Sequence, residues 1–357
     1  MTRKMINLGP LNQMRAALGE DARRRSGLME SVRHVYLRMD RDKAVEDSFE
    51  LMMEDLAESR HLSTGECSEK RAERLEGNIL VVLGGSGAGK TTAVRKLLSS
   101  HKLSPNYGGP DAHIVTVRVP CPCSVGELGK AVLSATGWDL ERRATAPEIW
   151  TMVRSRIRSL GILVLHLDEV QDAHETLKAD EKVKLRHLLR SLLVDEDYPI
   201  GLIMSGQAEF ETFLRPDRSS VRRGRWHLFG PITVEMDKEA IAAAVVHLAK
   251  TAALKVAPDA GPDLVPRLIH AGCYQLGITI EEIHDAIRAA LKSGATILER
   301  KHFADAFAAR TGNFLPWNPY LAQDYLAVDP TRVLAHAPAP VASTDQRKQK
   351  KSKGDKS

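Results

Sequence analysis

The chain has 357 residues, of which 43% are hydrophobic and 27% charged, as is ordinary for a water-soluble protein long enough to form two packed domains. No run reaches the ~18 consecutive apolar residues of a membrane-spanning helix, so we expect no membrane segment. The basic first residues precede no apolar run, and the four scattered cysteines form no disulfide framework, so we expect a cytoplasmic protein. The net charge of +5 indicates a mild preference for polyanionic partners.

The first 236 residues contain a helical stretch and then alternating strand and helix patterns. Residues 1–75 have apolar residues at helical spacing, which predicts an N-terminal helical segment. Over 76–236, apolar runs alternate with amphipathic stretches, which is typical of a parallel sheet buried between two helical layers. We therefore predict a three-layer α/β domain. Its expected strands are 79–83, 114–119, 162–167, 200–204 and 226–232, and its expected helices are 91–99, a pair within 124–160, and 177–193.

Strand patterns are absent from the sequence after residue 236. Four helical patterns, at 241–253, 263–271, 280–291 and 302–310, predict a smaller helical domain over 237–325. After about Thr331 the composition changes to alanine and proline and then to lysine, glutamine and serine. Because such a segment cannot bury enough apolar surface to order itself, we predict a disordered basic tail over 326–357.

A glycine-rich loop follows the first predicted strand and opens the next helix. It fits the complete phosphate-binding pattern G-x-x-x-x-G-K-[ST] in the strand and helix context that the pattern requires. Lys90 is expected to reach the β- and γ-phosphates of ATP, and the Thr91 hydroxyl to ligate Mg²⁺. The predicted nucleotide-binding residues are Gly84, Gly85, Ser86, Gly87, Ala88, Gly89, Lys90, Thr91 and Thr92.

Two carboxylates end the third predicted strand. Asp168 stands where a second magnesium ligand would lie, and Glu169 could polarise the attacking water as a general base. His166, within the same strand, is interpreted as a core histidine rather than a catalyst. Together with the loop, this pair predicts a catalytic centre built from Lys90, Asp168 and Glu169.

Two further groups of polar residues are candidates for catalysis. At the end of the fourth strand, Ser205 is preferred over Gln207 as the polar residue that faces the γ-phosphate. An arginine cluster precedes the fifth strand, and we predict that Arg222 or Arg223 acts on the nucleotide of a neighbouring copy. A DNA-facing surface or a solvated patch remains an alternative for this cluster, which consists of Arg215, Arg218, Arg222, Arg223 and Arg225.

The motifs, taken in order, resemble the TniB/TnsC-type transposition ATPases of the AAA+ class. The resemblance covers roughly residues 40–325 and rests on motifs rather than on overall composition. One departure is that the expected lid helix has no arginine at its start, and the nearest one is Arg288. The matching pieces are the phosphate loop, Asp168-Glu169-Val170-Gln171, Ser205 to Phe210, Arg222-Arg223, His302-Phe303-Ala304, Thr311-Gly312 and Asn318-Pro319-Tyr320.

The resemblance implies an AAA+ sheet with a helical lid that binds ATP and Mg²⁺ and hydrolyses the nucleotide. It also implies sequence-tolerant binding of double-stranded DNA, with Arg118 and Lys130 as candidate contacts, and self-association into a ring or helical filament. The partners would be a DDE transposase, which the protein recruits or activates, and a target-selector protein. Hydrolysis would drive disassembly from target DNA.

Three other interpretations of the motifs remain open. One is an ExeA-like or signalling AAA+ ATPase with a protein partner and no DNA role. Another is a P-loop kinase or small-molecule transferase, which the long helical domain and the arginine cluster disfavour. The third is a scaffold that binds ATP without hydrolysing it, which the presence of Glu169 disfavours.

Overall fold

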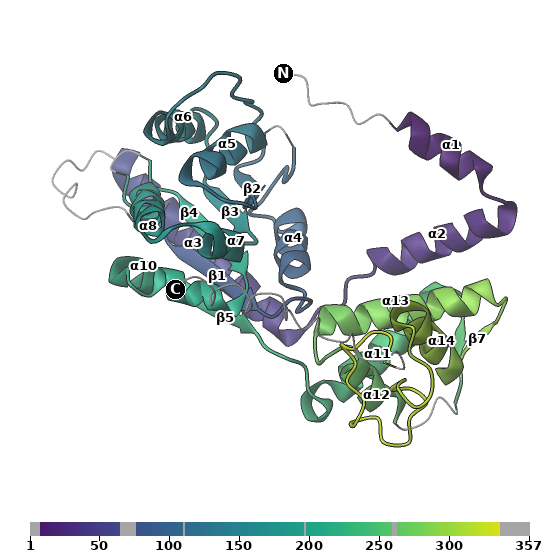
Figure 1. Ribbon diagram of the computed structural model, residues 1–357. Coiled ribbons are helices and arrows are strands. Elements are labelled where there is room, and N and C mark those ends of the chain that lie inside the picture. Colours follow the sequence, from purple (N-terminus) through teal and green to yellow (C-terminus); the bar gives the residue numbers. More distant parts are fainter. Residues whose placement is uncertain (1–7, 65–75, 110, 196–197, 259–262, 336–357) are drawn as a thin grey trace, which may run out of the picture.

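A computed structural model describes residues 8–64, 76–109, 111–195, 198–258 and 263–335. Figure 1 shows a sheet-containing domain and a smaller helical domain, with N-terminal helices that approach both. Most of the predicted basic tail (336–357), and residues 1–7 and 65–75 of the predicted N-terminal segment, lie outside the described residues.

The first domain is built on five parallel strands in the order β2-β3-β4-β1-β5. The predicted three-layer parallel sheet is confirmed, and no strand end differs from its predicted position by more than three residues. Because β4 lies between β3 and β1, residues at the carboxyl ends of these three strands share one edge of the sheet. The strands are β1 (Ile79–Gly84), β2 (Ile114–Arg118), β3 (Val164–Asp168), β4 (Gly201–Gly206) and β5 (Gly224–Phe229).

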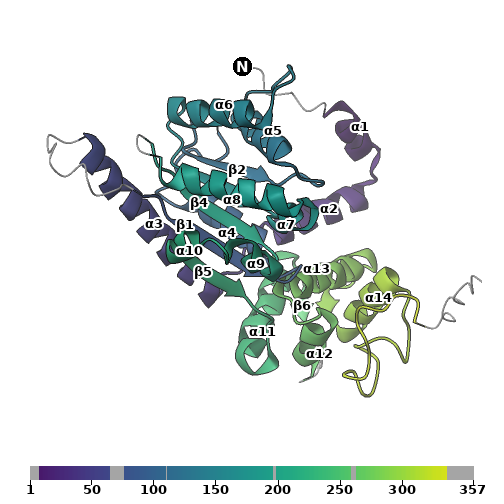
Figure 2. The same ribbon diagram turned by 60° about the vertical axis from the view of Figure 1, so that its left-hand side comes forward.

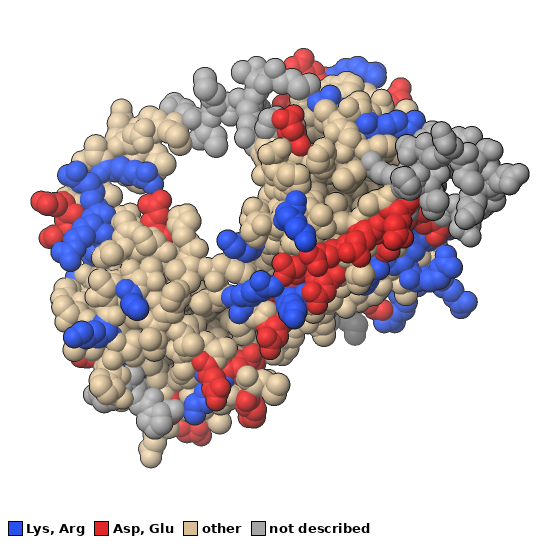
Figure 3. Space-filling view, turned by 180° about the vertical axis from the view of Figure 1, so that it is seen from behind, with Lys and Arg blue, Asp and Glu red and all other residues tan. Residues whose placement is uncertain are grey.

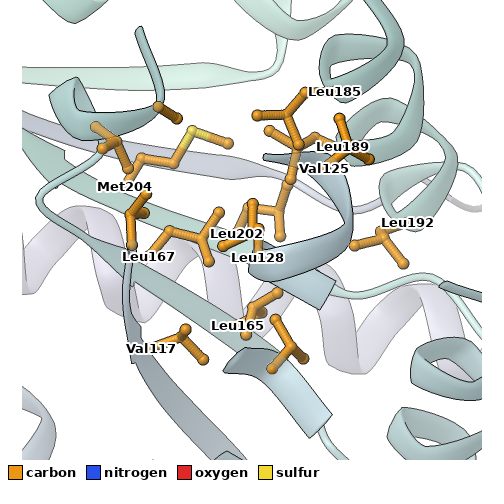
Figure 4. Close-up of a cluster of buried hydrophobic side chains, with 14 of the residues drawn as sticks. Val117, Val125, Leu128, Leu165, Leu167, Leu185, Leu189, Leu192, Leu202 and Met204 are labelled. Carbon is orange, nitrogen blue, oxygen red and sulfur yellow. The ribbon is translucent and has the colours of Figure 1, made fainter. Parts of the chain in front are cut away.

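Helices cover both faces of the sheet, as seen after rotation in Figure 2. One face packs against α5, α6 and α8, and a close-up of that layer shows Leu128 of α5 near Leu202 and Leu165 of the strands, and Leu189 of α8 near Val125 of α5 (Figure 4). Each such side chain stabilises the fold by about 1.5–3 kcal/mol through burial. The helices of this domain are α4 (Lys90–Ser100), α5 (Val125–Ala135), α6 (Ala146–Ser159), α7 (Gln171–Thr176), α8 (Ala179–Leu193), η1 (Ala208–Phe210), α9 (Glu211–Leu214) and α10 (Arg218–Arg222).

The N-terminal helices are divided between the two domains. In α3 (Asp40–Thr64), Phe49, Met52 and Leu56 are buried against the second face of the sheet, together with α4. In α2 (Glu20–His34), Met29 and Val32 join the core of the helical domain. The preceding α1 (Gly9–Ala17) has no buried residue. The segment predicted as one unit therefore packs on both domains.

The helical domain contains α11 (Val234–Thr251), α12 (Leu264–Ala271), α13 (Leu276–Lys292) and α14 (Arg300–Thr311). It also contains a parallel pair, β6 (Lys255–Val256) and β7 (Ile297–Leu298), where the sequence predicted no strand. Two-residue strands leave no periodicity in the sequence, because their pairing depends on tertiary packing. No helix in the described ranges is long and apolar enough to cross a membrane.

The described part of the predicted tail packs on the helical domain. Val328 and Ala335 are buried, and the carbonyl of Val328 accepts from Nε2 of His270 at 2.7 Å. Asn313 binds this segment twice: its Nδ2 donates to the carbonyl of Arg332 at 2.6 Å, and its Oδ1 accepts from the N–H of Ala335 at 2.7 Å. The helical domain therefore continues past the predicted boundary at residue 325, because polar side chains anchor a stretch that has few apolar residues.

Candidate nucleotide-binding site

The glycine-rich loop joins β1 to α4 at the carboxyl edge of the sheet. Gly87 and Gly89 have φ values of +78° and +91°, the left-handed region in which glycine carries no steric penalty. A side chain at Gly84 is excluded, because a Cβ there would lie 2.5 Å from the carbonyl oxygen of Phe229. The loop therefore has the curved backbone that directs N–H groups, and the N-terminus of α4, at an anion.

Lys90 is folded back onto this loop. Its Nζ donates to the carbonyl oxygens of Gly84 and Gly85 at 2.9 and 2.8 Å, and the residue is 8% exposed. Burial lowers the pKa of Lys90, and the charges of Glu169 and Asp168 oppose that shift. The ammonium group thus lies beside the loop, with both acidic residues close enough to affect it.

Thr91, Asp168 and Ser205 come together at the edge of the sheet. Oδ1 of Asp168 accepts from Oγ1 of Thr91 at 3.0 Å and from Oγ of Ser205 at 2.7 Å. Strand register explains the second contact, since Asp168 of β3 pairs with Ser205 of β4. Asp168 is 2% exposed, and its cationic neighbour, Arg95, approaches only to 3.4 Å with a side chain that is 56% exposed. A buried carboxylate beside a hydroxyl supplies the hard oxygen donors that Mg²⁺ prefers, so Thr91 and Asp168 fit the predicted metal ligands.

A chain of hydrogen bonds connects Asp168 to the interior of the sheet. Ser205 Oγ lies 2.9 Å from Nε2 of His166, Nδ1 of His166 lies 3.0 Å from Oγ1 of Thr116, and Thr116 lies 2.7 Å from the hydroxyl of Tyr107. Because the carboxylate can only accept, Ser205 must donate to Asp168. Nε2 of His166 then donates to Ser205, Thr116 donates to Nδ1 of His166, and Tyr107 donates to Thr116. Burial lowers the pKa of His166 to about 4, so the ring is neutral, with its proton on Nε2. The sequence predicted a core histidine but gave no sign that His166 fixes the orientation of Ser205.

Glu169 follows Asp168 with φ +60°, in the left-handed region that non-glycine residues seldom adopt. Its Oε2 accepts from Nε2 of Gln171 at 2.5 Å. Of the two residues considered at the end of β4, Ser205 contacts Asp168 directly, whereas the backbone N–H of Gln207 donates to Oε1 of Gln171 at 3.1 Å.

The two arginines predicted to act on a neighbour differ in their surroundings. The side chain of Arg223 is 8% exposed and forms an ion pair with Glu76, to which its Nε donates at 2.7 Å. The side chain of Arg222 is 75% exposed and lies 3.6 Å from Glu76. Arg223 is therefore engaged within its own chain, whereas most of the Arg222 side chain is exposed.

The arginine cluster adjoins an acidic surface. Figure 3, seen from behind, shows a band of acidic side chains along α3 beside basic side chains, in the region where α10 carries Arg218 and Arg222. The acidic band includes Asp47, Glu54 and Glu58, which are exposed. An extended polyanion lying over the cluster would also meet this band, whereas a compact anion would not.

A cavity of about 530 Å³ lies beside the phosphate loop, within the size range of small-ligand pockets. On one side it is bounded by α13, where the N–H of Gly277, in the first turn, donates to the carbonyl of Gly87 at 2.7 Å. Arg288 is exposed on the same helix and is not part of the lining. The sequence did not predict this cavity, because two of its walls lie outside the motifs. The walls include Val35, Tyr36 and Leu37 between α2 and α3, Arg41 in the first turn of α3, Gly89 and Thr92 near the loop, and Leu276, Ile280 and His284 of α13.

Comparisons with known proteins agree with this geometry. Residues 73–214 match a family model described as an AAA domain, and no curated protein matches the chain. The solved structure of the Aeropyrum pernix ORC1 protein in complex with DNA has a TM-score of 0.55 at 16% identity, covering 79% of this chain and 69% of that one. Cdc6p from Pyrobaculum aerophilum has a TM-score of 0.56 at 14% identity, covering 78% and 70%. The chain therefore has the P-loop AAA+ fold with a helical C-terminal part, while the narrower TniB/TnsC resemblance remains a prediction.

Proposed function

We propose that this protein is a magnesium-dependent ATPase that oligomerises on double-stranded DNA and regulates transposition. The observation that carries the enzymatic part is the meeting of Thr91, Asp168 and Ser205 beside the phosphate loop, with Lys90 and Glu169 adjacent. These residues come from β3, β4 and α4, so the fold, and not one local motif, assembles the site.

Each residue of the site would have a separate role in phosphoryl transfer. The loop backbone and Lys90 would bind the phosphates, with Lys90 exchanging the carbonyls of Gly84 and Gly85 for phosphate oxygens. Bound magnesium would neutralise phosphate charge, held by Thr91 and Asp168. Glu169 would accept a proton from the attacking water as the water oxygen bonds to the γ-phosphorus and the bond to the ADP oxygen breaks.

The adenosine moiety would occupy the cavity beside the loop. Its walls include the apolar side chains of Val35, Leu37 and Ile280, a setting that suits a planar base. Because these walls belong to different parts of the fold, a bound nucleotide would contact the N-terminal segment and the lid together.

Arg222 would complete the site of a neighbouring copy. Its exposed guanidinium and its position after β4 suit a contact with the γ-phosphate of a second molecule, whereas Arg223 is paired with Glu76. An arginine supplied in this way makes hydrolysis depend on assembly. The adjacent acidic band on α3 favours a compact phosphate over a DNA duplex at this surface.

The DNA and transposition roles rest on the resemblance of the motifs. The DNA role is also supported by the similar ORC1 protein, whose structure was determined in complex with DNA. Arg118 is exposed at the end of β2 and remains a candidate contact, and so does Lys130, whose Nζ lies 2.7 Å from Glu127. The proposed partners are a DDE transposase and a target-selector protein. The acidic band beside the arginine cluster favours one alternative, a related ATPase whose partner is a protein and not DNA.

The test is ATP hydrolysis with and without double-stranded DNA at low and high salt. We expect stimulation by DNA of any sequence, lost as salt rises, because phosphate contacts release counterions. Glu169→Gln should bind ATP yet hydrolyse it slowly, and it should remain on DNA. Hydrolysis that is indifferent to DNA would favour the protein-partner alternative, and failure of the mutant to bind ATP would refute the role of Glu169.

A further inference from the structure

Gln171, the first residue of α7, connects the ends of two strands. It is 5% exposed, and both ends of its amide are used. Nε2 donates to Oε2 of Glu169 at 2.5 Å, and Oε1 accepts from the backbone N–H of Gln207 at 3.1 Å. The side chain therefore bridges the residue after β3 and the residue after β4.

The backbone at Glu169 needs such support. Its φ of +60° is unfavourable for a residue with a side chain, and conformations of this kind persist only where neighbouring contacts enforce them. The N–H of Val170 donates to the carbonyl of Ser205, and the N–H of Asp172 donates to the carbonyl of Glu169, both at 3.1 Å. These bonds hold the main chain, whereas among the described contacts the carboxylate itself is held by Gln171.

Space for the bridge depends on Gly206. A Cβ at this position would lie 2.6 Å from Oε1 of Gln171 and 2.7 Å from Cγ2 of Val170. Any side chain there would push the Gln171 amide away from the N–H of Gln207. The hydrogen bonds of the Gln171 amide therefore depend on the glycine at position 206.

We propose that Gln171 is a positioning residue that holds the Glu169 carboxylate toward the phosphate loop and fixes it relative to Ser205. The inference rests on the proposed ATP hydrolysis, in which Glu169 accepts the proton of the attacking water. With Oε2 bound to Gln171, Oε1 is the oxygen left for that water, so the carboxylate has one working orientation. Because Gln171 also holds Gln207, the general base and the end of β4 keep a fixed separation.

The first test separates catalysis from binding. Gln171→Leu keeps the approximate size of the side chain but removes the amide, and we expect kcat to fall about 10-fold or more, which is what one charge-assisted hydrogen bond is worth. KM for ATP should stay within about twofold, because the contacts of the phosphate loop are untouched. Gly206→Ala should likewise lower kcat and leave KM nearly unchanged, since the new methyl group displaces the side-chain amide of Gln171 without changing that residue.

A matched control lies at the other end of α7. The Thr176 hydroxyl donates to the carbonyl of Asp172 at 2.6 Å and accepts from the N–H of Cys123 at 2.9 Å, so Thr176→Val removes hydrogen bonds from the same helix without touching Glu169. It should lower stability and leave kcat per folded molecule unchanged. An unchanged kcat in both Gln171→Leu and Gly206→Ala, or a parallel rise in KM, would overturn the proposal.

A second measurement does not depend on activity. Unfolding of Glu169→Ala, Gln171→Ala and the double variant forms a thermodynamic cycle, and we expect the double variant to lose less stability than the two single losses combined. Additive losses would show that Gln171 does not hold Glu169. Wild-type protein that fails to hydrolyse ATP would overturn the proposed function. The thermodynamic cycle would still show whether Gln171 and Glu169 interact, because it does not depend on activity.

Discussion

Removing the Ser205 hydroxyl should destabilise the sheet domain more than an ordinary buried serine would. The hydroxyl donates to Asp168 at 2.7 Å and receives the Nε2 proton of His166 at 2.9 Å, and the residue is fully buried. In Ser205→Ala the carboxylate loses a charge-assisted bond worth about 1.5–3 kcal/mol, and the buried His166 N–H loses its acceptor at a cost of about 1–3 kcal/mol. The two effects overlap, so we expect the unfolding free energy to fall by about 3 kcal/mol.

The matched control is Ser104→Ala. Ser104 is 5% exposed, and its hydroxyl donates to the carbonyl of Leu98 at 2.6 Å, a neutral acceptor. That substitution should cost about 1 kcal/mol. Urea denaturation followed by tryptophan fluorescence measures both losses, since Trp138, Trp150 and Trp226 all lie in the sheet domain. Ser205→Ala should also need more magnesium for half-maximal hydrolysis. Equal losses in the two variants would refute the idea that Ser205 orients Asp168.

Three other expectations concern the loop, the arginines and the lid. Lys90→Ala should weaken ATP binding about 100-fold or more in calorimetry, because at least two charge-assisted hydrogen bonds to phosphate are lost. Lys96→Ala removes an exposed lysine from the same helix and should leave ATP affinity unchanged. Arg222→Ala should bind ATP normally but hydrolyse it poorly, and mixing it with Lys90→Ala protein should partly restore hydrolysis. Arg223→Ala should mainly lower the melting temperature. If the mixture shows no restored activity, Arg222 does not act on a neighbouring molecule. Burial raises the pKa of Glu282 to about 7, so the folded state retains a proton that the unfolded state releases near pH 4.5. Stability should therefore fall by about 3 kcal/mol as pH rises from about 4.5 to 7, and melting curves of Glu282→Gln should lack that part of the pH dependence.

The features that the sequence predicted are those whose signal is continuous along the chain. The apolar run ending at Gly84 and the run ending at Asp168 each mark a buried strand, and a parallel sheet brings their ends together without further information. The features that it did not predict depend on partners far apart in the chain. Arg223 meets Glu76 across 147 positions, and neither residue differs in the sequence from an ordinary surface charge.

The direction in which a side chain points is a second property that the sequence did not predict. Asp168-Glu169-Val170-Gln171 was noted as a motif, yet nothing in its letters shows that Gln171 turns back to Glu169 while also reaching Gln207. That arrangement requires β4 to lie beside β3 and a position without a side chain at Gly206. The strands were predictable, but their order β2-β3-β4-β1-β5 follows from packing.

The cavity beside the phosphate loop is lined by four separate lengths of chain: the connection between α2 and α3 with the start of α3, the start of α4, the end of β5 at Phe229, and the first turns of α13. A protein begun at Glu76 would keep each motif residue and the whole sheet, yet it would lack the wall formed by Val35 to Arg41. It would also lose α3, whose Phe49 and Met52 cover one face of the strands. The smallest part of the chain that folds on its own is therefore larger than the set of motifs, and removing residues before Glu76 should expose both the remaining lining of the cavity and one face of the sheet to solvent.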